Sequence, residues 1–441
     1  MISTILNMWK IKELRQRLLF TFGLLAVYRI GSFVPTPGID PSQLHRFTGG
    51  LGGGLMNMMD LFTGGNLSNV TIFALGVMPY ISASIIIQLM TSVIPTLERL
   101  SREGEGGRRK INQYTRYGTI IVCVIQAVML GKSLYQAQVN LIQNPILFVF
   151  VLTIALTAGT TFVMWLGEQI TSRGIGNGIS LIITAGIVSR MPTAARMMWT
   201  LYGVGSADDT RATWQAVVLL VMFVAVVAGV IFVIQGQRRI PVQYAKRVAS
   251  GGRVVGGAST YLPLRVNQAG VIPIIFASSI MIIPDALAKY MPDSWGVVKQ
   301  AVEWCSHSGD GYMWLYAAAI ILFCYFYTAI TFNPVQIADD FKKNGAFIPG
   351  IRPGKPTAEF LEHTMVRITT AGAIFLAVIA VVPMIVSQRL NIPYLIASFL
   401  GGTGLLIVVG VMLDTMQQVE AHLLMRHYDG FMKQGKLRGR Y

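Results

Sequence analysis

The chain has 441 residues, of which 53% are hydrophobic and 13% charged, and its mean hydropathy is +0.56. Soluble domains carry about 25% charged residues, so this composition excludes a large soluble protein and indicates one that crosses a membrane many times. A net charge of +16 would suggest nucleic-acid binding in a soluble protein, but in a membrane protein its placement along the chain matters more.

Apolar runs predict ten membrane-spanning helices, with lengths suited to a hydrocarbon core roughly 30 Å thick. If the N-terminus is inside, 27 of the 36 Lys and Arg residues fall in the inside segments, and the other nine fall in the outside segments or within the expected spans. This bias predicts that both termini are cytoplasmic. The expected spans are 18–34, 72–94, 117–135, 146–167, 179–197, 214–235, 270–288, 313–332, 369–387 and 394–413.

The second span and the residues before it are unusual. Gly76 and Pro79 lie near the start of span 72–94, where they would weaken or kink a buried helix. A separate apolar piece, LMNMMDLF at 55–62, lies between a glycine-rich run and Gly64–Gly65. It is too short to cross a bilayer. We therefore predict a movable segment, hinged on glycines, that sits in a membrane cavity.

Part of this span occurs again later in the chain. Residues 76–86 read GVMPYISASII and residues 270–280 read GVIPIIFASSI, with 7 of 11 positions identical. Repeated membrane segments that Gly and Pro interrupt indicate internal repeats with the functional site between them. With five spans in each half, the halves 1–213 and 214–441 would insert in opposite orientations. The expected fold is an all-α polytopic membrane protein with two inverted five-helix halves.

Three long inside segments are more than short connectors. Residues 96–116 are dense in mixed charge, and residues 333–368 contain GAFIPGIRPG, a Gly/Pro turn with Arg352 at its tip. In residues 236–268, a glycine-rich turn near 250–253 and the alternating STYLPLRV predict two short strands or a long projecting finger. Basic loops can simply determine topology, but the length of two of them favours docking of a cytosolic partner.

The sequence predicts no catalytic site, cofactor or metal site. The five histidines fall in expected loops or the tail, and no GxGxxG or GxxxxGK[ST] motif is present. The glycine-rich RGIGNGIS at 173–180 joins two spans, so we expect a tight cytoplasmic turn there. Ionisable groups such as Arg29, Glu168 and Asp285 lie near span ends, which argues against an ion-coupled solute transporter.

An aliphatic stripe follows one face of the second span. Val77, Ile81 and Ile85 recur at i, i+4 and i+8, and Ile275 occupies the repeat position of Ile81. Packing against lipid or a neighbouring helix would explain such a stripe by itself. Together with the interrupted repeats and the short hinged segment, it predicts a hydrophobic constriction that blocks water and ions.

Seven motifs occur in the order FALGVMPYISASIIIQ, EGGRRKINQYTRYGT, GEQITSRGIGNGIS, GQRRIPVQYAKR, VNQAGVIPIIFASSI, FIPGIRPG and GTGLLIVVGV. They resemble the SecY family of protein-conducting channels over essentially the whole chain. The resemblance implies two five-helix halves around an hourglass pore that passes unfolded secretory polypeptide and releases apolar helices sideways into lipid. It is no enzyme. An insertase without a through-pore would share only the lateral exit, and it would lack the short plug helix that the resemblance implies outside the pore.

The resemblance also implies partners and a location. The partners are the SecE and SecG membrane subunits, the SecA motor ATPase, the ribosome, signal sequences with unfolded substrates, and the lipid bilayer. The location is the bacterial plasma (inner) membrane.

Residue roles follow from the matching motifs. The pore ring falls on Val77, Ile81, Ile183, Ile275 and Ile407, with Ile179 nearby, and position 77 is valine where isoleucine is expected. Residues 55–66 are similar to the family's plug, a short helix that sits outside the pore ring. Its side chains would be Leu55, Met56, Met58, Met59, Asp60, Leu61 and Phe62. The lateral-gate candidates are Ser82, Gln88, Thr115 and Asn267. The docking surface is assigned to Arg238, Arg239, Lys246, Arg247, Lys342, Lys343 and Arg352. Arg253 stands alone where two adjacent basic residues are expected.

Overall fold

A computed structural model describes residues 11–40, 60, 62–202, 210–244, 247–248, 254–255, 259–281, 284, 296–305, 311–390, 392, 396–397, 399 and 402–434. Contacts divide the chain into a first unit, Met1–Gly203 with Ile407–Tyr441, and a second unit, Val204–Leu406. The last helix thus packs with the N-terminal helices. The inverted halves 1–213 and 214–441 concern insertion topology and stay a prediction.

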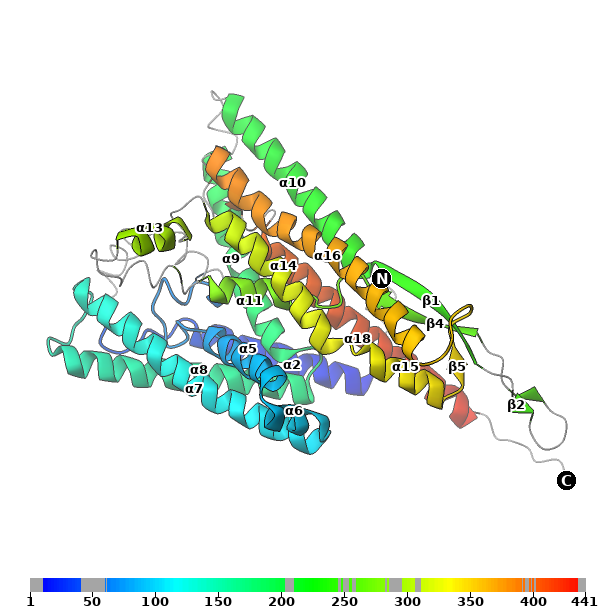
Figure 1. The fold of residues 1–441 in the computed structure, drawn as a ribbon. Coiled ribbons are helices and arrows are strands. Elements are labelled where there is room, and N and C mark those ends of the chain that lie inside the picture. The colour runs from blue at the N-terminus through cyan, green and yellow to red at the C-terminus, as the bar shows by residue number, and fades with distance from the viewer. Residues whose placement is uncertain are drawn as a thin grey trace. The chain divides into compact units, whose positions relative to one another are not determined.

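The first unit is helical (Figure 1). Its helices are α2 (Lys12–Gly31), α5 (Met78–Val93), α6 (Pro95–Arg102), α7 (Glu105–Gln136), α8 (Pro145–Arg173), α9 (Gly178–Tyr202) and most of α18 (Thr403–Gln434). An apolar core joins α7 and α8 to the chain that leads into α5. It is built from Leu67, Val70, Ala74, Leu75, Cys123, Ala127, Leu134, Phe148, Leu152 and Leu156.

Local sequence explains where these helices begin and bend. Pro145 opens α8, and the Asn144 side chain accepts the N–H groups of Ile146 (3.1 Å) and Leu147 (3.5 Å). Pro95 forces extended backbone on the residue before it, so the chain turns by 103° between α5 and α6.

The expected tight turn between α8 and α9 is confirmed. Ile175 N–H donates to Thr21 Oγ1 of α2 (3.2 Å), and Gly176 N–H donates to Gln418 Oε1 of α18 (3.0 Å). Asn177 Oδ1 then accepts from Ile179 N–H (3.1 Å) and caps α9. Two other helices of the unit therefore fix this four-residue connection in place.

The second unit combines helices with a small sheet (Figure 1). The helices are α10 (Thr210–Gln235), α11 (Ile272–Ile280), α13 (Gly296–Cys305), α14 (Tyr312–Thr331), α15 (Pro334–Lys343) and α16 (Lys355–Leu390). The strands are β1 (Gln237–Tyr244), β2 (Arg247–Val248), β3 (Val254–Val255), β4 (Ser259–Arg265) and β5 (Ala346–Phe347). In its apolar window α16 is 56% buried, against 28–39% for the other six apolar helices, which makes it the most enclosed of these helices.

The strands predicted in residues 236–268 are confirmed. β1 pairs antiparallel with β4, from Gln237 opposite Arg265 to Gln243 opposite Ser259, and β2 pairs with β3. β5 joins the other edge of β1, giving the order β4-β1-β5. The two long segments that we expected to be separate loops therefore share one sheet.

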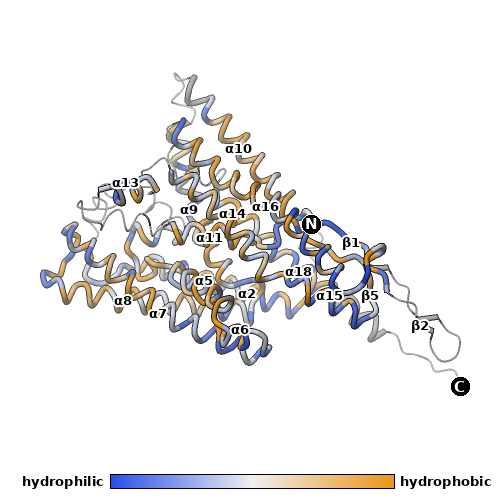
Figure 2. The backbone as a smooth tube through the Cα atoms, in the orientation of Figure 1, coloured by the Kyte–Doolittle hydropathy of each residue, from blue (hydrophilic) through white to orange (hydrophobic). Residues whose placement is uncertain are grey.

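Seven described helices are long and apolar enough to cross a membrane: α7, α8, α9, α10, α14, α16 and α18. The bent pair α5–α6 is an eighth if it is one span. Figure 2 shows hydrophobic residues along most of α8, α10 and α14, and hydrophilic residues around β1 and β5. The protein is therefore a multi-pass membrane protein.

Several helices begin at other residues than the expected spans. α7 begins at Glu105 and α16 at Lys355, well before the expected span starts at 117 and 369, and α5 begins at Met78 rather than 72. Hydropathy marks only the part of a helix that lies in lipid, whereas backbone hydrogen bonds can continue the helix into water. Much of 96–116 and 333–368 is consequently helix rather than loop.

Candidate functional site

The two repeated segments fold alike at their helix starts. Gly76 (φ +52°) and Gly270 (φ +63°) both adopt left-handed backbone, which glycine permits without a Cβ clash. The next residue is a helix N-cap in both: Val77 has φ −95° and ψ −4°, and Val271 has φ −91° and ψ −6°. A proline follows in the first turn of each helix. The sequence repeat thus corresponds to a structural one.

The expected pore-ring residues are almost all buried. Val77, Ile81, Ile183, Ile275 and Ile407 are each at most 6% exposed, and Ile179 is partly buried. Val77 and Ile81 begin α5, Ile179 and Ile183 lie in the first two turns of α9, and Ile407 lies near the start of α18. Ile275 is in α11 of the second unit. The stripe is therefore not a simple lipid-facing surface, and its closure into a ring stays a prediction.

The structure describes only part of the expected plug. Asp60 and Phe62 are buried, at 3% and 5% exposure, although both belong to a segment expected to move. The other five plug side chains, Leu55, Met56, Met58, Met59 and Leu61, lie outside the described residues. The contacts of Asp60 show how this part of the segment is held.

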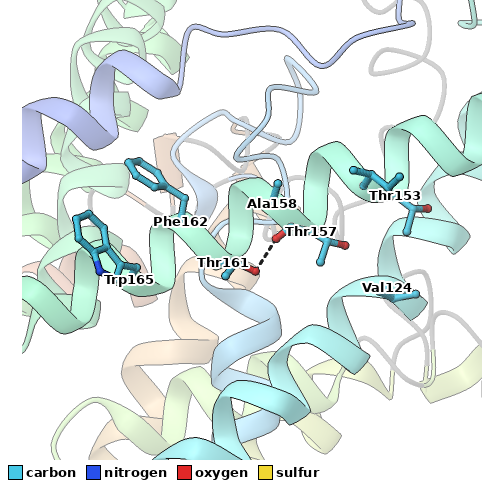
Figure 3. A pocket seen from close by; sticks show the side chains of 8 residues that line it. Val124, Thr153, Thr157, Ala158, Thr161, Phe162 and Trp165 are labelled. Atoms are coloured by element: carbon cyan, nitrogen blue, oxygen red, sulfur yellow. Dashed lines mark hydrogen bonds between the residues drawn. The ribbon is translucent and has the colours of Figure 1, made fainter.

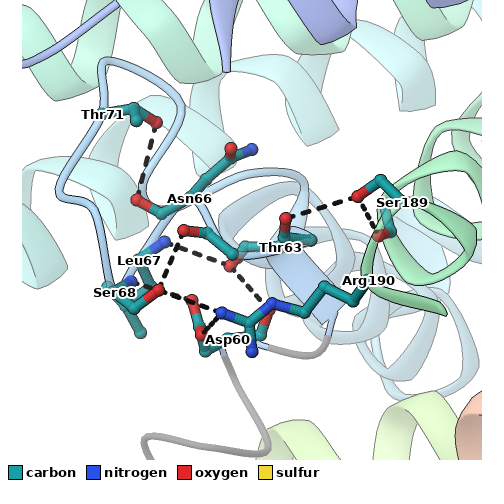
Figure 4. Close-up of polar contacts among 11 residues, drawn as sticks. Asp60, Thr63, Asn66, Leu67, Ser68, Thr71, Ser189 and Arg190 are labelled. Carbon is teal, nitrogen blue, oxygen red and sulfur yellow. Dashed lines mark hydrogen bonds and ion pairs between the residues drawn. The ribbon is translucent and has the colours of Figure 1, made fainter. Parts of the chain in front are cut away.

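Asp60 forms a buried ion pair with Arg190 of α9 (Figure 4). Its carboxylate Oδ2 meets Arg190 Nη2, while Oδ1 accepts the N–H of Ser68 at 2.8 Å. Arg190 Nη2 also donates to Ser68 Oγ at 3.0 Å. We call Asp60, Ser68 and Arg190 the plug clamp. Each member contacts the other two, so the charges do not face apolar surroundings alone.

The same part of α9 packs closely against the glycines that follow Asp60. Gly64 (φ +71°) approaches α9 so closely that a Cβ there would lie 2.6 Å from the Cα of Gly186. The Ser189 hydroxyl lies within hydrogen-bond distance of the Gly64 carbonyl (3.4 Å) and the Gly186 carbonyl (2.7 Å) (Figure 4). These glycines, expected to act as free hinges, are packed against a helix.

α2 supports this segment from another side. Tyr28 Oη donates to the Thr63 carbonyl at 3.3 Å and accepts from Asn66 Nδ2 at 3.2 Å. Tyr28 also stacks on Phe73, with ring centroids 5.8 Å apart. Residues 60 and 62–68 are therefore held by α2 and α9 together.

Sequence reasoning missed Arg190, although it lies within the expected span 179–197. The available signal was charge: Asp60 and Arg190 are isolated opposite charges in two apolar stretches. A single sequence gives no reason to pair them across such a separation. Gly186 and Ser189 carried no signal of their own.

The lateral-gate candidates lie in both units. Ser82 and Gln88 are on α5 and partly buried, and Thr115 is buried on α7, where its hydroxyl donates to the Ile111 carbonyl at 3.0 Å. α5 and α7 pack together. Asn267, in the second unit, donates from Nδ2 to the Gly270 carbonyl at 2.9 Å, next to the start of α11.

The expected docking residues are brought to the small sheet and its surroundings. Arg238 and Arg239 are exposed on β1, Lys342 and Lys343 are exposed at the end of α15, and Arg352 is exposed in the turn before α16. α15 leads directly into β5, and β5 pairs with β1. These basic residues therefore lie around one small sheet. Arg247 is in β2, and Lys246 lies outside the described residues.

A groove of about 630 Å³ lies along α7 and α8, apart from all of these residues (Figure 3). It is almost entirely apolar and contains no residue of the expected site. Its walls are Val124, Thr153, Ile154, Thr157, Ala158, Thr161, Phe162 and Trp165.

Comparisons with known proteins agree on one family. The SecY family model matches residues 71–416. The protein translocase subunit SecY of Escherichia coli (strain K12) is 46% identical over 432 residues, which cover 97% of this chain and 96% of that protein. The solved structure of a protein-conducting channel has a TM-score of 0.61 at 18% identity, covering 92% of this chain and 91% of that one. Sec61 in the canine ribosome-channel complex from the endoplasmic reticulum gives 0.58 at 16%, with the same coverage.

Proposed function

The chain belongs to the SecY family of protein translocase subunits. We propose which of its residues seal the channel, release helices into lipid and bind partners. It is the central pore-forming subunit of a translocon, a channel protein and not an enzyme. Separate groups of residues carry out sealing, lateral release and docking.

The seal is an aliphatic ring formed by Val77, Ile81, Ile183, Ile275 and Ile407, with Ile179 beside it. The observation that carries this assignment is the matching start of α5 and α11, which buries Ile81 and Ile275 at equivalent positions of two repeats. A narrow aliphatic constriction excludes water and ions by dewetting while its side chains touch. It binds nothing tightly, so it can stretch around a moving polypeptide.

Residues 55–66 form the plug that covers this ring in the resting channel. The buried positions of Asp60 and Phe62 support a segment seated inside the protein rather than on its surface.

Lateral release takes place between the second and third spans on one side and the seventh and eighth on the other. Ser82, Gln88, Thr115 and Asn267 line this gate. A signal sequence opens it because its apolar helix gains more free energy in lipid than the polar gate contacts lose. Apolar helices leave by the same route.

The basic residues around β1, α15 and Arg352 dock a cytosolic partner. The SecA motor and the ribosome are the proposed partners, and both present acidic or phosphate groups that Arg and Lys can bind. Sec61 in the canine complex is a ribosome-bound member of the same fold. SecE and SecG are the proposed membrane partners.

Ten spans in two inverted halves, 1–213 and 214–441, place both termini in the cytoplasm of a bacterium, with the protein in its inner membrane. The excess of Lys and Arg in the inside segments supports this orientation.

The ring is tested by widening it. Ile81→Gly with Ile275→Gly should raise the resting conductance of the purified channel in a planar bilayer by about tenfold or more, because the dry constriction is lost. The matched control is Ile86→Gly with Ile280→Gly, an equivalent repeat-related pair in which Ile86 is 48% exposed. The control removes the same atoms and adds the same helix-weakening glycines. A double variant that conducts no more than this control would place the constriction elsewhere.

A further inference from the structure

Arg190 is a charged residue within an apolar helix, and its location needs an explanation. α9 is one of the helices apolar enough to cross a membrane, and Arg190 lies well inside it. An unpaired arginine at such a depth is costly, so charged residues there normally face a partner or water. Asp60 and Ser68 are the partners that the described residues provide.

The strength of this pair depends on how dry its surroundings are. The two side chains are only 5% and 21% exposed, and in a low-dielectric environment a broken pair leaves two uncompensated charges. In water the same charges attract each other weakly and are solvated separately. The pair is therefore strong when the site is dry and weak when water enters.

We propose that Arg190 is a positioning residue of the channel: it holds the C-terminal half of the plug, from Asp60 on, in the closed position through the plug clamp and releases it when the opening pore fills with water. The proposal rests on the proposed function, since it requires a plug that moves. It adds a residue outside both the ring and the plug. Closure becomes cooperative, because a dry pore strengthens the clamp and the clamp keeps the pore dry.

Charge variants test whether the ion pair sets the closed state. Arg190→Gln should raise the resting conductance, and the export of a reporter with a defective signal sequence, by about tenfold. Arg190→Lys keeps the positive charge and should stay within about threefold of the unmodified chain. The matched control is Arg196→Gln, which removes an exposed arginine from the same helix and should change neither quantity.

Two results would overturn the proposal at this stage. One is an Arg190→Gln channel as tight as the unmodified one. The other is an Arg190→Lys channel as leaky as Arg190→Gln, which would mean that the shape of the side chain matters and its charge does not. The thermal unfolding midpoint of each purified variant separates a leak from general misfolding.

A cross-link tests whether the clamp is released. Asp60→Cys and Arg190→Cys are combined in a chain whose three native cysteines are replaced by alanine, and a short, reducible bifunctional thiol reagent joins the new pair. Translocation into vesicles should fall by about tenfold and return on reduction, because water entering the pore cannot break a covalent link as it breaks the ion pair. Each single cysteine variant treated with the same reagent is the control. Unchanged translocation by the cross-linked protein would show a permanent anchor and overturn release.

Failure of this proposal is distinguishable from failure of the proposed function. If the unmodified chain in vesicles translocates polypeptide while the cross-link and the charge variants have no effect, only the role of Arg190 is wrong. If the unmodified chain, supplied with its partners, translocates nothing, the function itself is wrong.

Discussion

Arg352 lies in a turn whose backbone is fixed on both sides. Gly350 (φ +85°) and Gly354 (φ +101°) take left-handed conformations, and Thr357 Oγ1 donates to the Arg352 carbonyl at 2.8 Å. The side chain itself is exposed. A rigid turn thus presents a guanidinium with a planar fork of donors that matches a carboxylate or a phosphate.

We expect Arg352→Glu to reduce motor-driven translocation into vesicles by about tenfold or more, because it turns a charge-assisted contact into repulsion. Arg352→Lys keeps the charge but loses the fork, so it should recover only part of the activity. Lys355→Glu is the matched control: it reverses an exposed charge three residues away, at the start of α16, where a carboxylate is favourable. Equal effects of the two Glu variants, or full activity of Arg352→Lys, would reduce Arg352 to one charge among many.

The sequence identified individual site residues where a local sequence pattern marked them. The Gly-Ile-Arg-Pro-Gly turn identified Arg352 directly, and the repeat identified Ile81 with Ile275. The plug clamp was not readable, because Asp60, Ser68 and Arg190 meet only through the tertiary fold. Gly186 was also hidden, since its role is to have no side chain at a point where Gly64 approaches.

The helices of the first unit pack closely at glycines. A Cβ at Gly159 of α8 would lie 2.1 Å from the carbonyl oxygen of Ile72, in the chain that leads into α5. Gly23 of α2, in contrast, has no atom within 4 Å of the position a Cβ would take. Both are helical, so intrinsic helix propensity favours alanine at each.

Gly159→Ala should therefore destabilise the protein by about 3 kcal/mol, because the methyl group meets backbone that cannot move aside. Gly23→Ala should stabilise it by about 0.5–1 kcal/mol, since alanine loses less conformational entropy in a helix. Unfolding midpoints of the two purified variants in detergent measure the difference. Shifts of the same sign in both would show that close packing at Gly159 does not limit α8.

At the level of elements, the sequence predicted whether a segment is helix or strand better than it predicted the residues at which the element begins and ends. Alternation in STYLPLRV predicted β4, and its partner β1 followed from the turn between them. β5 has two residues, Ala346 and Phe347, which is too short for any period to show. α7 and α16 extend beyond their apolar parts because charged residues such as Arg108 and Glu359 are compatible with a helix in water.

The orientation of the chain in the membrane is a property of the whole molecule, and the basic residues predict it. The two ends of α7 should lie on opposite sides of the membrane, with Arg109 inside and Gln143, beyond its C-terminal end, outside. Both residues are exposed, so each can be replaced by cysteine in the chain that lacks native cysteines. A membrane-impermeant thiol reagent should label Gln143→Cys in intact cells and Arg109→Cys only in inverted vesicles. The reverse pattern would overturn the orientation that the basic residues predict.

The composition alone predicted a multi-pass membrane protein, and the order of the motifs predicted the family. The grouping of α18 with the N-terminal helices was beyond sequence reasoning. It depends on contacts such as Val419 against Leu14 and Ile175, which join the two ends of the chain. Apolar residues at these positions predict burial but do not name the partner.

The position of β5 on β1 also bears on how the chain is made. β1 and β4 are close in sequence and can pair as soon as both have been synthesised. The other edge of β1, at Gln243 and Tyr244, pairs with β5 only after α11, α13, α14 and α15 have been produced. A chain in which this intervening stretch has not been completed therefore keeps an open strand edge on β1. An unpaired strand edge is a template for pairing with another chain, so the pairing of β5 with β1 removes a site of aggregation once the chain is complete.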